Sequence, residues 1–513
     1  MIKQVKYLFL GLCMLLSACS LPSLEGRPES MALTPADIAQ TSLGRSLIPL
    51  QAAHGSHSGF HLLSDPKDAF AARAMLCRTA EKTLDVQYYI WKPDITGTLL
   101  LDELLEAAQR GVRVRLLLDD NGTSGMDAWL ASLDSHENFE VRLFNPFSVR
   151  SPKSLGFITH FSRANRRMHN KSLTADNSAT ILGGRNIADE YFGATNNVAF
   201  SDLDVMAVGP VVQETSNDFD RYWASASAYP VSDLLPAANK DPMQQLHARA
   251  EQLEQGNSAA QYVNAIRNLP FIKQLLAGQL DLEWAPAYLV SDDPSKGLGQ
   301  AQGSDLMVNQ FGRAIGKPQQ HLELVSPYFV PTQAGVDFFS QLRAKGVQVR
   351  ILTNALEATD VAAVHSGYAK RRKALLEVGV ELFEMPRTPG LPQPKDLNSP
   401  FGSSGSSLHA KTFAVDNKQV YIGSFNFDPR SLNLNTEMGV VMQSRRFADM
   451  MQEAFDNDIK NTTYQVRLTE QGQLYWLDNR SGQPLRLDTE PGTTMLQRSL
   501  IRVLGWLPIE WLL

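Results

Sequence analysis

Cysteine is scarce in this 513-residue sequence, which contains three: Cys13, Cys19 and Cys77. None stands in a CxxC pair or at a Cys/His spacing typical of a zinc site, and so few thiols cannot build a disulfide framework. Cys77 lies in "AARAMLCRTAEKTLDVQYYIW", on the apolar side of an expected helix, and is predicted to be a core residue. The chemistry of the protein therefore has to come from other side chains, and neither a metal nor another cofactor is expected.

Positive charge is not in excess either, because the sequence has 48 lysines and arginines and 54 aspartates and glutamates, which gives a formal net charge of -6. Such a protein has no general basic field, which counts against a nucleic acid as its main partner but allows a local basic cleft. The content of 43% hydrophobic and 20% charged residues is that of an ordinary globular protein. At this length a single core no longer grows, so two similar domains or two halves of one large domain are expected.

The N-terminal apolar run "YLFLGLCMLL" is too short to cross a bilayer comfortably as a permanent helix. It follows Lys3 and Lys6 and ends in "LSAC", the layout of a short secretory signal. Cys19, directly after Leu-Ser-Ala, resembles the acylated cysteine of bacterial lipoprotein signals, so residues 1–18 are predicted to be a signal peptide; an uncut signal anchor is the alternative. This start predicts a membrane-anchored envelope protein facing the periplasm. Ser20 replaces the Asp that often retains lipoproteins in the inner membrane, which favours the outer membrane.

Two distant segments carry the same polar pattern, "MHNKSLTADNSATILGGRNIAD" (168–189) and "LHAKTFAVDNKQVYIGSFNFD" (408–428). Each has a His, a Lys two residues later, an Asp five residues after the Lys, a Gly-Gly or Gly-Ser pair, and an Asn. The residues are His169, Lys171, Asp176 and Asn186 in the first copy, and His409, Lys411, Asp416 and Asn426 in the second. Four residue types at one spacing, present twice, favour catalysis over the alternative of core histidines and surface lysines.

Strand and helix patterns alternate around both clusters. "TLDVQYYIW" reads as a buried strand, "TLLLDELLEAAQR" as an amphipathic helix ending at Gly111, and "VRVRLLLDD" as the next strand. "HLELVSPYFV", "AGVDFFSQLRAKG" and "VQVRILTN" repeat this order later. The alternation indicates an α/β sheet, and a period of roughly 240 residues indicates a duplicated domain instead of a solenoid. The predicted parts are a signal peptide (1–18), a linker (19–58), a first half (59–235), a helical and loop connection (236–310), a second half (311–465) and a C-terminal extension (466–513).

Alternation of side chains along a strand places His169 and Lys171 on one face, and likewise His409 and Lys411. By the same parity Asp176 and Asp416 point to the opposite face if the strands stay regular. These aspartates of the motif are therefore expected to hold the scaffold in place. Each Asn follows a Gly-containing turn, which lets the chain fold the amide back toward the preceding strand.

Two such clusters facing each other across a pseudo-twofold axis would suit a phosphodiester. One imidazole would attack phosphorus, and the other would protonate the leaving alcohol and later activate the incoming one. The lysines, with Asn186 and Asn426, would hold the non-bridging oxygens and supply the charge that a metal provides elsewhere.

An attacking imidazole needs its second nitrogen held in one tautomer, usually by a carboxylate. Asp202 in "FSDLDVMAVGPVV" and Glu437 in "NTEMGVVMQ" are the candidates, because each opens an apolar strand about 30 residues after a motif His. Asp204 is the rival to Asp202.

The doubled HxKxxxxD pattern, each copy followed by GGxN or GSxN, resembles the phospholipase D superfamily. "LDVQYYIW", "GVRVRLLLDDN", "GGRNIADEYFG", "SPYFVPT", "GSFNFDPRS" and "PIEWLL" are similar to bacterial cardiolipin synthases of the C type, over nearly the whole chain from about residue 60. The resemblance implies a duplicated phospholipase D-like fold of two mixed sheets flanked by helices, pseudo-twofold related with one shared active site. It also implies a phosphatidyltransferase that passes a phosphatidyl group, with phosphatidylethanolamine as the suggested donor, through a phosphohistidine to phosphatidylglycerol.

The resemblance further implies a division of roles. The N-terminal His of the superfamily is usually the nucleophile, so attack is assigned to His169 and acid/base work to His409, although the reverse is possible. Asp202 is assigned to orient His409, and Glu437 to orient His169, each across the interface between the halves.

Three other functions stay open from the sequence alone. A phospholipase D could hand the same intermediate to water, a phosphodiester nuclease is disfavoured by the negative charge, and a catalytically dead envelope scaffold is disfavoured by the complete motifs. An accessory protein is possible.

Two segments carry signals of lipid contact. The C-terminal "TTMLQRSLIRVLGWLPIEWLL" has an apolar helical side that fits a helix in a membrane interface, and docking on its own domain is the alternative. Arg163, Arg166 and Arg167 beside the first motif could receive a lipid phosphate or could simply be solvated.

Overall fold

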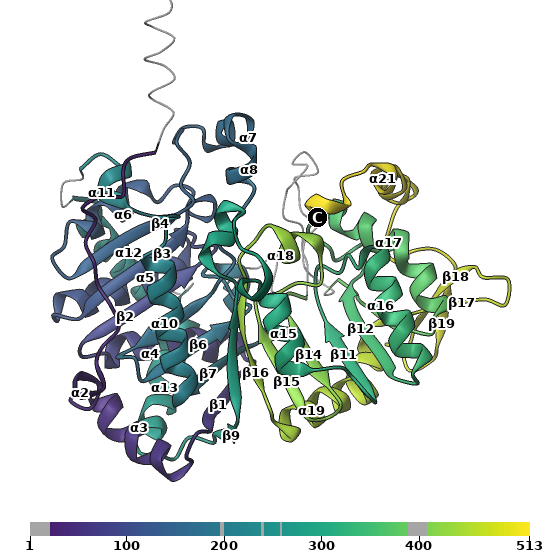
Figure 1. Cartoon of the computed structure of the whole chain (residues 1–513), viewed down its shortest axis with the longest axis horizontal. Helices are drawn as coiled ribbons and strands as arrows, with labels where there is room; N and C mark the ends of the chain where they lie inside the picture. Colours follow the sequence, from purple (N-terminus) through teal and green to yellow (C-terminus); the bar gives the residue numbers. More distant parts are fainter. Residues whose placement is uncertain (1–20, 195–199, 238–240, 257–258, 388–407) are drawn as a thin grey trace, which may run out of the picture.

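The computed structural model describes residues 21–194, 200–237, 241–256, 259–387 and 408–513. The predicted signal peptide and the predicted lipidation site Cys19 lie outside these ranges. The described chain forms two α/β halves along the long axis of the molecule, coloured purple to teal and green to yellow in Figure 1.

The first half is built on a nine-stranded mixed sheet with the order β8-β4-β3-β2-β5-β6-β7-β1-β9. Strands β2, β3 and β4 are parallel, and β5, β6, β7 and β1 continue the sheet as antiparallel neighbours. The strands are β1 (Ser58–Leu63), β2 (Thr83–Tyr88), β3 (Arg113–Asp119), β4 (Phe139–Phe144), β5 (Ser172–Ala175), β6 (Ala179–Gly183), β7 (Asp204–Val208), β8 (Ala228–Pro230) and β9 (Glu283–Ala285).

The second half has a ten-stranded mixed sheet with the order β10-β16-β15-β14-β11-β12-β13-β17-β18-β19. Its parallel part is β11, β12 and β13. The strands are β10 (Ala287–Ser291), β11 (His321–Val325), β12 (Gln348–Asn354), β13 (Glu381–Met385), β14 (Thr412–Val415), β15 (Gln419–Gly423), β16 (Met438–Met442), β17 (Tyr464–Leu468), β18 (Leu474–Asp478) and β19 (Leu485–Leu487).

Eight strands follow one another in the same order in both sheets, since β8-β4-β3-β2-β5-β6-β7-β1 corresponds to β17-β13-β12-β11-β14-β15-β16-β10. The prediction of a duplicated α/β fold with two mixed sheets is confirmed. The strands beyond these eight are β9 in the first sheet, which comes from residues 236–310, and β18 and β19 in the second sheet, which come from residues 466–513. Residues 236–310 also supply β10, the counterpart of β1.

Helices flank both sheets (Figure 1). Those of the first half and the connection are α2 (Pro35–Ile38), α3 (Ser42–Ala53), α4 (Pro66–Thr79), α5 (Ile95–Gln109), α6 (Asp127–Asp134), α7 (Gly156–Thr159), α8 (Phe161–Ala164), α9 (Asp189–Phe192), α10 (Pro210–Trp223), α11 (Val231–Leu234), α12 (Asp241–Gln255), α13 (Ala260–Asn268), α14 (Phe271–Leu276) and α15 (Met307–Ile315). Those of the second half are α16 (Thr332–Ala344), α17 (Ala362–Glu377), α18 (Pro429–Asn433), α19 (Arg445–Glu453), α20 (Lys460–Thr462) and α21 (Met495–Trp506).

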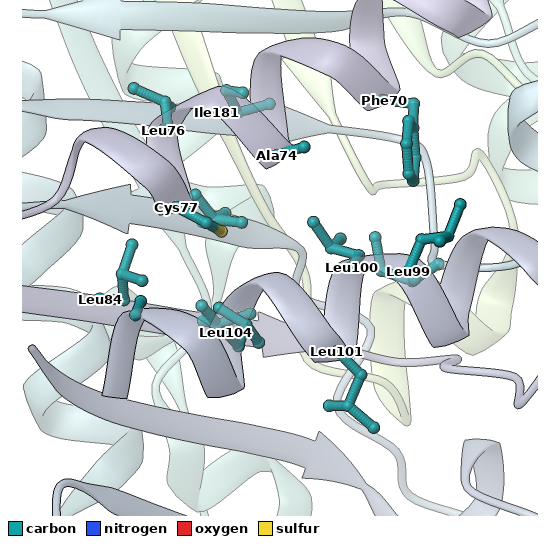
Figure 2. Close-up of a cluster of buried hydrophobic side chains, with 14 of the residues drawn as sticks. Phe70, Ala74, Leu76, Cys77, Leu84, Leu99, Leu100, Leu101, Leu104 and Ile181 are labelled. Atoms are coloured by element: carbon teal, nitrogen blue, oxygen red, sulfur yellow. The ribbon is translucent and has the colours of Figure 1, made fainter. Parts of the chain in front are cut away.

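The core of the first half forms where α4 and α5 cover the sheet. Figure 2 shows Cys77 there, surrounded by apolar side chains of both helices and of the strands below them. Asp94 begins α5 by accepting a hydrogen bond from the Gly97 N–H, and Gly111 follows its end with a φ of 95°, a conformation that favours glycine. Cys77 is fully buried, in agreement with its expected place in the core.

The two halves meet through a separate apolar layer between their sheets. Side chains of β6 and β7, including Leu182 and Val205, pack with side chains of β15 and β16, including Ile422 and Val440. Burial of this layer fixes the two motif-bearing strand pairs relative to each other, because tightly packed interiors resist sliding.

The aspartates of the two motifs lie in turns. β5 ends at Ala175, and Asp176 follows in the turn to β6 with a φ of 48°, so the strand parity expected from the sequence does not extend to it. Its carboxylate accepts hydrogen bonds from the backbone N–H groups of Glu81, Lys82 and Thr83, the start of β2. Asp416 has a φ of 53° and holds the N–H groups of residues 319–321 before β11 in the same way.

The C-terminal helix α21 lies against α17 and buries Ile501. Its other apolar side chains, such as Leu500 and Trp506, are exposed. Among the described helices, none combines the length and the apolar character that crossing a membrane requires.

We expect Asp176→Ala to destabilise the protein more than Asp416→Ala does. Asp176 is fully buried and Asp416 only half-buried, so removal of the first leaves N–H donors without a partner and without water, a cost of about 1–3 kcal/mol. Urea denaturation measures the difference, with the exposed Asp488→Ala as the matched control. Unchanged stability of Asp176→Ala combined with lost activity would instead place the carboxylate in the chemistry.

Candidate active site

Two short reciprocal bridges bring the motif histidines to the interface between the halves. Met168 pairs with Thr436, and the His169 N–H donates to the Thr436 carbonyl at 2.9 Å. In the mirrored arrangement Leu408 pairs with Ser201, and the His409 N–H donates to the Ser201 carbonyl at 2.8 Å. Each motif His is thus placed by the backbone of the opposite half, directly beside that half's candidate carboxylate.

Each imidazole hydrogen-bonds to a carboxylate from the opposite half. His169 Nδ1 lies 2.8 Å from Glu437 Oε2, and His409 Nδ1 lies 2.6 Å from Asp202 Oδ2. A carboxylate at Nδ1 favours the tautomer with the proton on Nδ1 and leaves the lone pair of Nε2 available for chemistry. These are the two contacts across the interface that the family resemblance implied.

Burial sets the protonation of both rings. It lowers the pKa of His169 to about 4, against the opposing effect of the Glu437 charge. It lowers the pKa of His409 to about 3, with the nearby Lys411 charge acting in the same direction. Both imidazoles are therefore neutral near pH 7, which is the form that a nucleophile or a general base needs.

The motif lysines are buried next to their histidines. Lys171 Nζ donates to the His169 carbonyl at 2.6 Å, and Lys411 Nζ donates to the His409 carbonyl at 2.5 Å. Lys411 Nζ also lies 2.8 Å from His409 Nδ1. Burial lowers the pKa of Lys411 to about 8 and that of Lys171 well below its usual range, while the charges of Glu437 and Asp202 oppose this at both lysines. The charges of Glu437 and Asp202 thus act on both lysines, so the two motifs share one electrostatic environment.

The Gly-Gly and Gly-Ser pairs explain how the carboxylates reach the rings. A Cβ on Gly184 would collide with the Asp202 carboxylate, so only glycine leaves room for it. The equivalent Ser424 donates its hydroxyl to Glu437 Oε2 at 2.5 Å, and Ser431 donates to Glu437 Oε1 at 2.8 Å. Sequence reasoning missed both serines, although the change from Gly-Gly to Gly-Ser between the copies was the visible signal.

Asp204, the rival to Asp202, contacts arginines instead of a histidine. Its carboxylate lies 2.7 Å from Arg73 Nη2 and 3.2 Å from Arg185 Nη1, and all three side chains are buried. These two cations neutralise Asp204 inside the first half, whereas Asp202 faces His409.

The two motif asparagines differ in their contacts. Asn186 Oδ1 accepts from the Ile90 N–H at 3.2 Å, and its amide donates to the Tyr191 hydroxyl at 2.9 Å. Asn426 is buried as well, but its Oδ1 has no hydrogen-bond partner among the described residues. Binding of a phosphate oxygen by either amide stays a prediction.

Aromatic side chains enclose the imidazoles. The edge of Tyr89 meets the ring of His169 with centroids 5.1 Å apart, and Tyr191 meets His409 at 5.0 Å. Tyr89 also borders a pocket of ≈ 470 Å³ that Lys92 and Asn121 help to line. This volume lies in the range of small-molecule binding sites.

The arginines beside the first motif all donate to main-chain carbonyls. Arg163 Nη1 donates to the Pro146 carbonyl, and Arg166 Nη1 donates to the Asn433 carbonyl, each at 2.8 Å. Arg167 is buried and donates to the carbonyls of Ala164 and Asn145. Nη2 of Arg163 and Nη2 of Arg167 have no hydrogen-bond partner among the described residues, so receipt of a lipid phosphate stays a prediction.

One set of metal-type ligands is assembled among the described residues, away from the motifs on α5 and α12. Ligand atoms of Asp102, Glu106 and His247 lie within 4.8 Å of one another. Asp102 Oδ1 is already 3.0 Å from His247 Nδ1, so hydrogen bonding satisfies this pair without an ion.

The fold and the site together define a two-lobed enzyme of the phospholipase D type, in which each lobe contributes one His, one Lys and the carboxylate for the opposite His. A family model described as cardiolipin synthase, phospholipase D-like domain, matches residues 75–223 and 312–459. The chain belongs to this cardiolipin synthase family of the phospholipase D superfamily, so the resemblance seen in the sequence and the assignment as an enzyme of the phosphatidyltransferase class are confirmed.

Individual proteins of known sequence or structure are similar to this chain over most of its length. Cardiolipin synthase C of Escherichia coli (strain K12) is 47% identical over 92% of this chain and 99% of its own. An uncharacterized protein of Helicobacter pylori (strain ATCC 700392 / 26695) is 32% identical over 86% of this chain and 87% of its own. The crystal structure of phosphatidylserine synthase of Haemophilus influenzae Rd KW20 aligns with a TM-score of 0.58 at 13% identity, covering 91% of this chain and all of that one, which shows the shared fold.

We expect the stability of the protein to fall as the pH drops from about 6.5 to about 4. The unfolded chain binds protons at His169 and His409 in this window, whereas the folded chain, with pKa values of about 4 and about 3, does not. Each substitution, His169→Asn or His409→Asn, should reduce the slope of unfolding free energy against pH by about 1.4 kcal/mol per unit.

The exposed His160→Asn is the matched control for this measurement, made by urea denaturation at several pH values. A slope that is the same in all four proteins would mean that the two buried rings already carry a proton in the folded state.

Proposed function

We propose that this protein makes cardiolipin by transferring a phosphatidyl group to phosphatidylglycerol through a phosphohistidine. The observation that carries the proposal is the reciprocal pairing of His169 with Glu437 and of His409 with Asp202. Two neutral imidazoles, each with Nδ1 occupied by a carboxylate, give a nucleophile and an acid/base for the same phosphorus atom. The activity named for the Escherichia coli relative supports the choice of product.

In the first step His169 Nε2 attacks the phosphorus of the donor lipid. An N–P bond forms, the bond from phosphorus to the headgroup oxygen breaks, and the leaving alcohol takes a proton from His409 Nε2. His409 is neutral in the free enzyme, and the negative charge of the bound phosphodiester favours the imidazolium that this step needs. Glu437 stabilises the positive charge that develops on His169.

In the second step a hydroxyl of phosphatidylglycerol attacks the phosphohistidine. His409 removes its proton, the new P–O bond forms, and the N–P bond to His169 breaks. Cardiolipin leaves, His409 releases to water the proton that it took up when the donor lipid bound, and both rings return to their neutral forms. Water in place of phosphatidylglycerol would give phosphatidic acid, so the same site could also act as a phospholipase D.

Lys171 and Lys411 hold the non-bridging oxygens in this scheme, with Asn186 and Asn426 as further donors. Each buried amino group sits next to the histidine of its own motif. Burial lowers the pKa of both lysines, and the negative charge of a bound phosphodiester favours their charged form in this low-dielectric setting, where charge stabilisation is strongest. Asp176 and Asp416, the remaining motif residues, act on the backbone and not on the substrate.

Phosphatidylethanolamine is the proposed donor and phosphatidylglycerol the acceptor. Lys92 and Asp94 line the pocket beside Tyr89, but Lys92 pairs with Glu190 and Asp94 accepts from the N–H groups of Gly97 and Asp189. The choice of donor and acceptor therefore rests on the family resemblance. We further propose that the protein works at a membrane surface, with an accessory protein as an optional partner and without a nucleic acid.

Purified protein given phosphatidylglycerol and phosphatidylethanolamine together should form cardiolipin and release ethanolamine. His169→Ala and His409→Ala should each lower the rate by at least about 10³, because each removes one of the two groups on which both steps depend. Thin-layer separation of labelled lipids measures the products, and mass spectrometry of protein quenched during turnover locates the phosphatidyl group on His169.

The competing functions give other results in the same assay. Phosphatidic acid as the sole product would assign the site to hydrolysis, and a phosphatidyl group on His409 would reverse the two roles. Degradation of DNA with no change in lipids would indicate a nuclease, and activity that survives both substitutions would remove the motifs from the chemistry.

The location proposed for this protein is the bacterial cell envelope, where acylated Cys19 anchors it to a membrane and the enzyme faces the periplasm. The Leu-Ser-Ala-Cys sequence supports the anchor, and Ser20 supports the outer membrane over the inner one.

The intact mass of protein extracted from membranes should equal that of residues 19–513 plus a diacylglyceryl group and an N-acyl chain. Cys19→Ser should abolish the modification, because the thiol is the acylation site. Recovery of a chain that still begins at Met1 would indicate an uncut signal anchor.

A further inference from the structure

Exposed apolar side chains are concentrated in two segments. Seventeen large apolar residues are exposed among those that the structure describes, and ten of them lie between residues 155 and 161 or between residues 495 and 511. The first group, named the loop patch, is Leu155, Ile158 and Phe161. The second, named the C-terminal patch, is Met495, Leu496, Leu500, Val503, Trp506, Leu507 and Trp511. Single exposed apolar residues are ordinary, but groups of this kind mark interaction sites.

The C-terminal patch belongs to a helix that is already docked. Thr494 and Gln497 form a capping box at the start of α21, and the helix lies against α17 with Ile501 buried. The chain end is also fixed, because Leu513 packs with Val330 and Val364. The exposed apolar side of α21 therefore belongs to a helix whose position on the second half is fixed.

Both patches lie in stretches without acidic residues. Residues 145–175, which contain the loop patch, have no Asp or Glu. Arg150 and Lys153 of this stretch are ion-paired with Asp120 and Asp127, so the positive charge beside the loop patch rests on Arg163. Residues 491–509, which contain most of the C-terminal patch, have Arg498 and Arg502 and no acidic residue. The molecule as a whole is negatively charged, so this local excess of cations is complementary to an anionic surface.

Arg430 of α18 links the segments that carry the two patches. Its guanidinium donates to the Asn165 carbonyl at 2.8 Å, immediately after α8, and to the Leu512 carbonyl at 3.2 Å. Its backbone N–H donates to the Leu513 carbonyl at 2.7 Å. In Figure 1, α7, α8 and α21 accordingly lie along the same upper edge of the molecule, with α18 between and below them.

We propose that the loop patch and the C-terminal patch together form one face that docks on an anionic phospholipid bilayer. Aromatic and aliphatic side chains with flanking arginines and few carboxylates are the composition of an interfacial membrane contact. Glu510, beside Trp511, is the carboxylate next to the C-terminal patch, and Lys370 and Arg371 pair with it. Two weak contacts held at a fixed spacing reinforce each other, because the second binds at high effective concentration. This docking face extends the proposed function and rests on it in one respect. Because α18 follows the second motif directly, docking would present the active site to lipid headgroups.

The test uses the mature chain that begins at residue 19, with Cys19→Ser, so that neither an acyl anchor nor the apolar run of the predicted signal peptide contributes to binding. Co-sedimentation with vesicles of equal phosphatidylglycerol and phosphatidylcholine should give binding that becomes about tenfold weaker or more in Leu500→Ser/Trp506→Ser, and weaker also in Ile158→Ser. Vesicles of phosphatidylcholine alone should bind the parent protein less well. Met450→Ser is the matched control, since Met450 is exposed on α19 at the opposite edge of the molecule.

Activity on short-chain lipids below their micelle concentration separates docking from chemistry. The variants should keep this activity and an unchanged thermal midpoint, because their side chains are exposed. Weakened vesicle binding would support the face even if no protein in the series made cardiolipin, an outcome that would reject only the proposed function. Equal vesicle binding by all variants, or a loss as large in Met450→Ser, would overturn the face. A lipid-free dimer that Leu500→Ser/Trp506→Ser dissociates would assign the surface to a second copy and overturn it too.

Discussion

The hydrogen bond between an imidazole of one half and a carboxylate of the other is the interaction on which the site depends. Neither His169 nor His409 finds its carboxylate within its own half, because Glu437 and Asp202 each reach across. The backbone bridges beside them and the apolar layer between the sheets fix the distance that these short contacts require. Folding of each half alone would therefore give a scaffold with an unoriented histidine, and docking of the halves completes the chemistry.

The two pairs are equivalent in position but not in chemistry. Asp202 packs against Gly184, which leaves room for a short side chain held close to the ring, whereas Glu437 is longer and is fixed by the hydroxyls of Ser424 and Ser431. Lys411 touches the ring of His409, and Lys171 contacts only the backbone of its own histidine. Such differences are what the proposed scheme needs, because it assigns attack to one imidazole and proton transfer to the other.

Much of this could be predicted from the sequence, because duplication leaves a signal that one copy would not. The repeated order of strands and the doubled motif gave the fold, and the position of Glu437 and Asp202 at strand starts made both contacts reachable. The strand alternation used to place Asp176 does not apply, because the strand ends before this residue. The end of the strand depends on turn geometry and on the N–H donors of a distant segment. The carbonyl contacts of the arginines beside the first motif could not be predicted, because guanidinium groups that hold main-chain carbonyls look the same in sequence as free surface charges.

A single chain with two fused halves can also do what a symmetric dimer of one half cannot. Identical subunits would surround both imidazoles with the same groups, so a nucleophile and an acid would have to arise from the same environment. Fusion allows residues that exist only once to bind both halves, and Arg430 is such a residue, because it ties the end of α8 in the first half to the C-terminus of the second. The same connection holds the two apolar patches at one edge, so the asymmetry on which the proposed division of roles depends also underlies the proposed docking face.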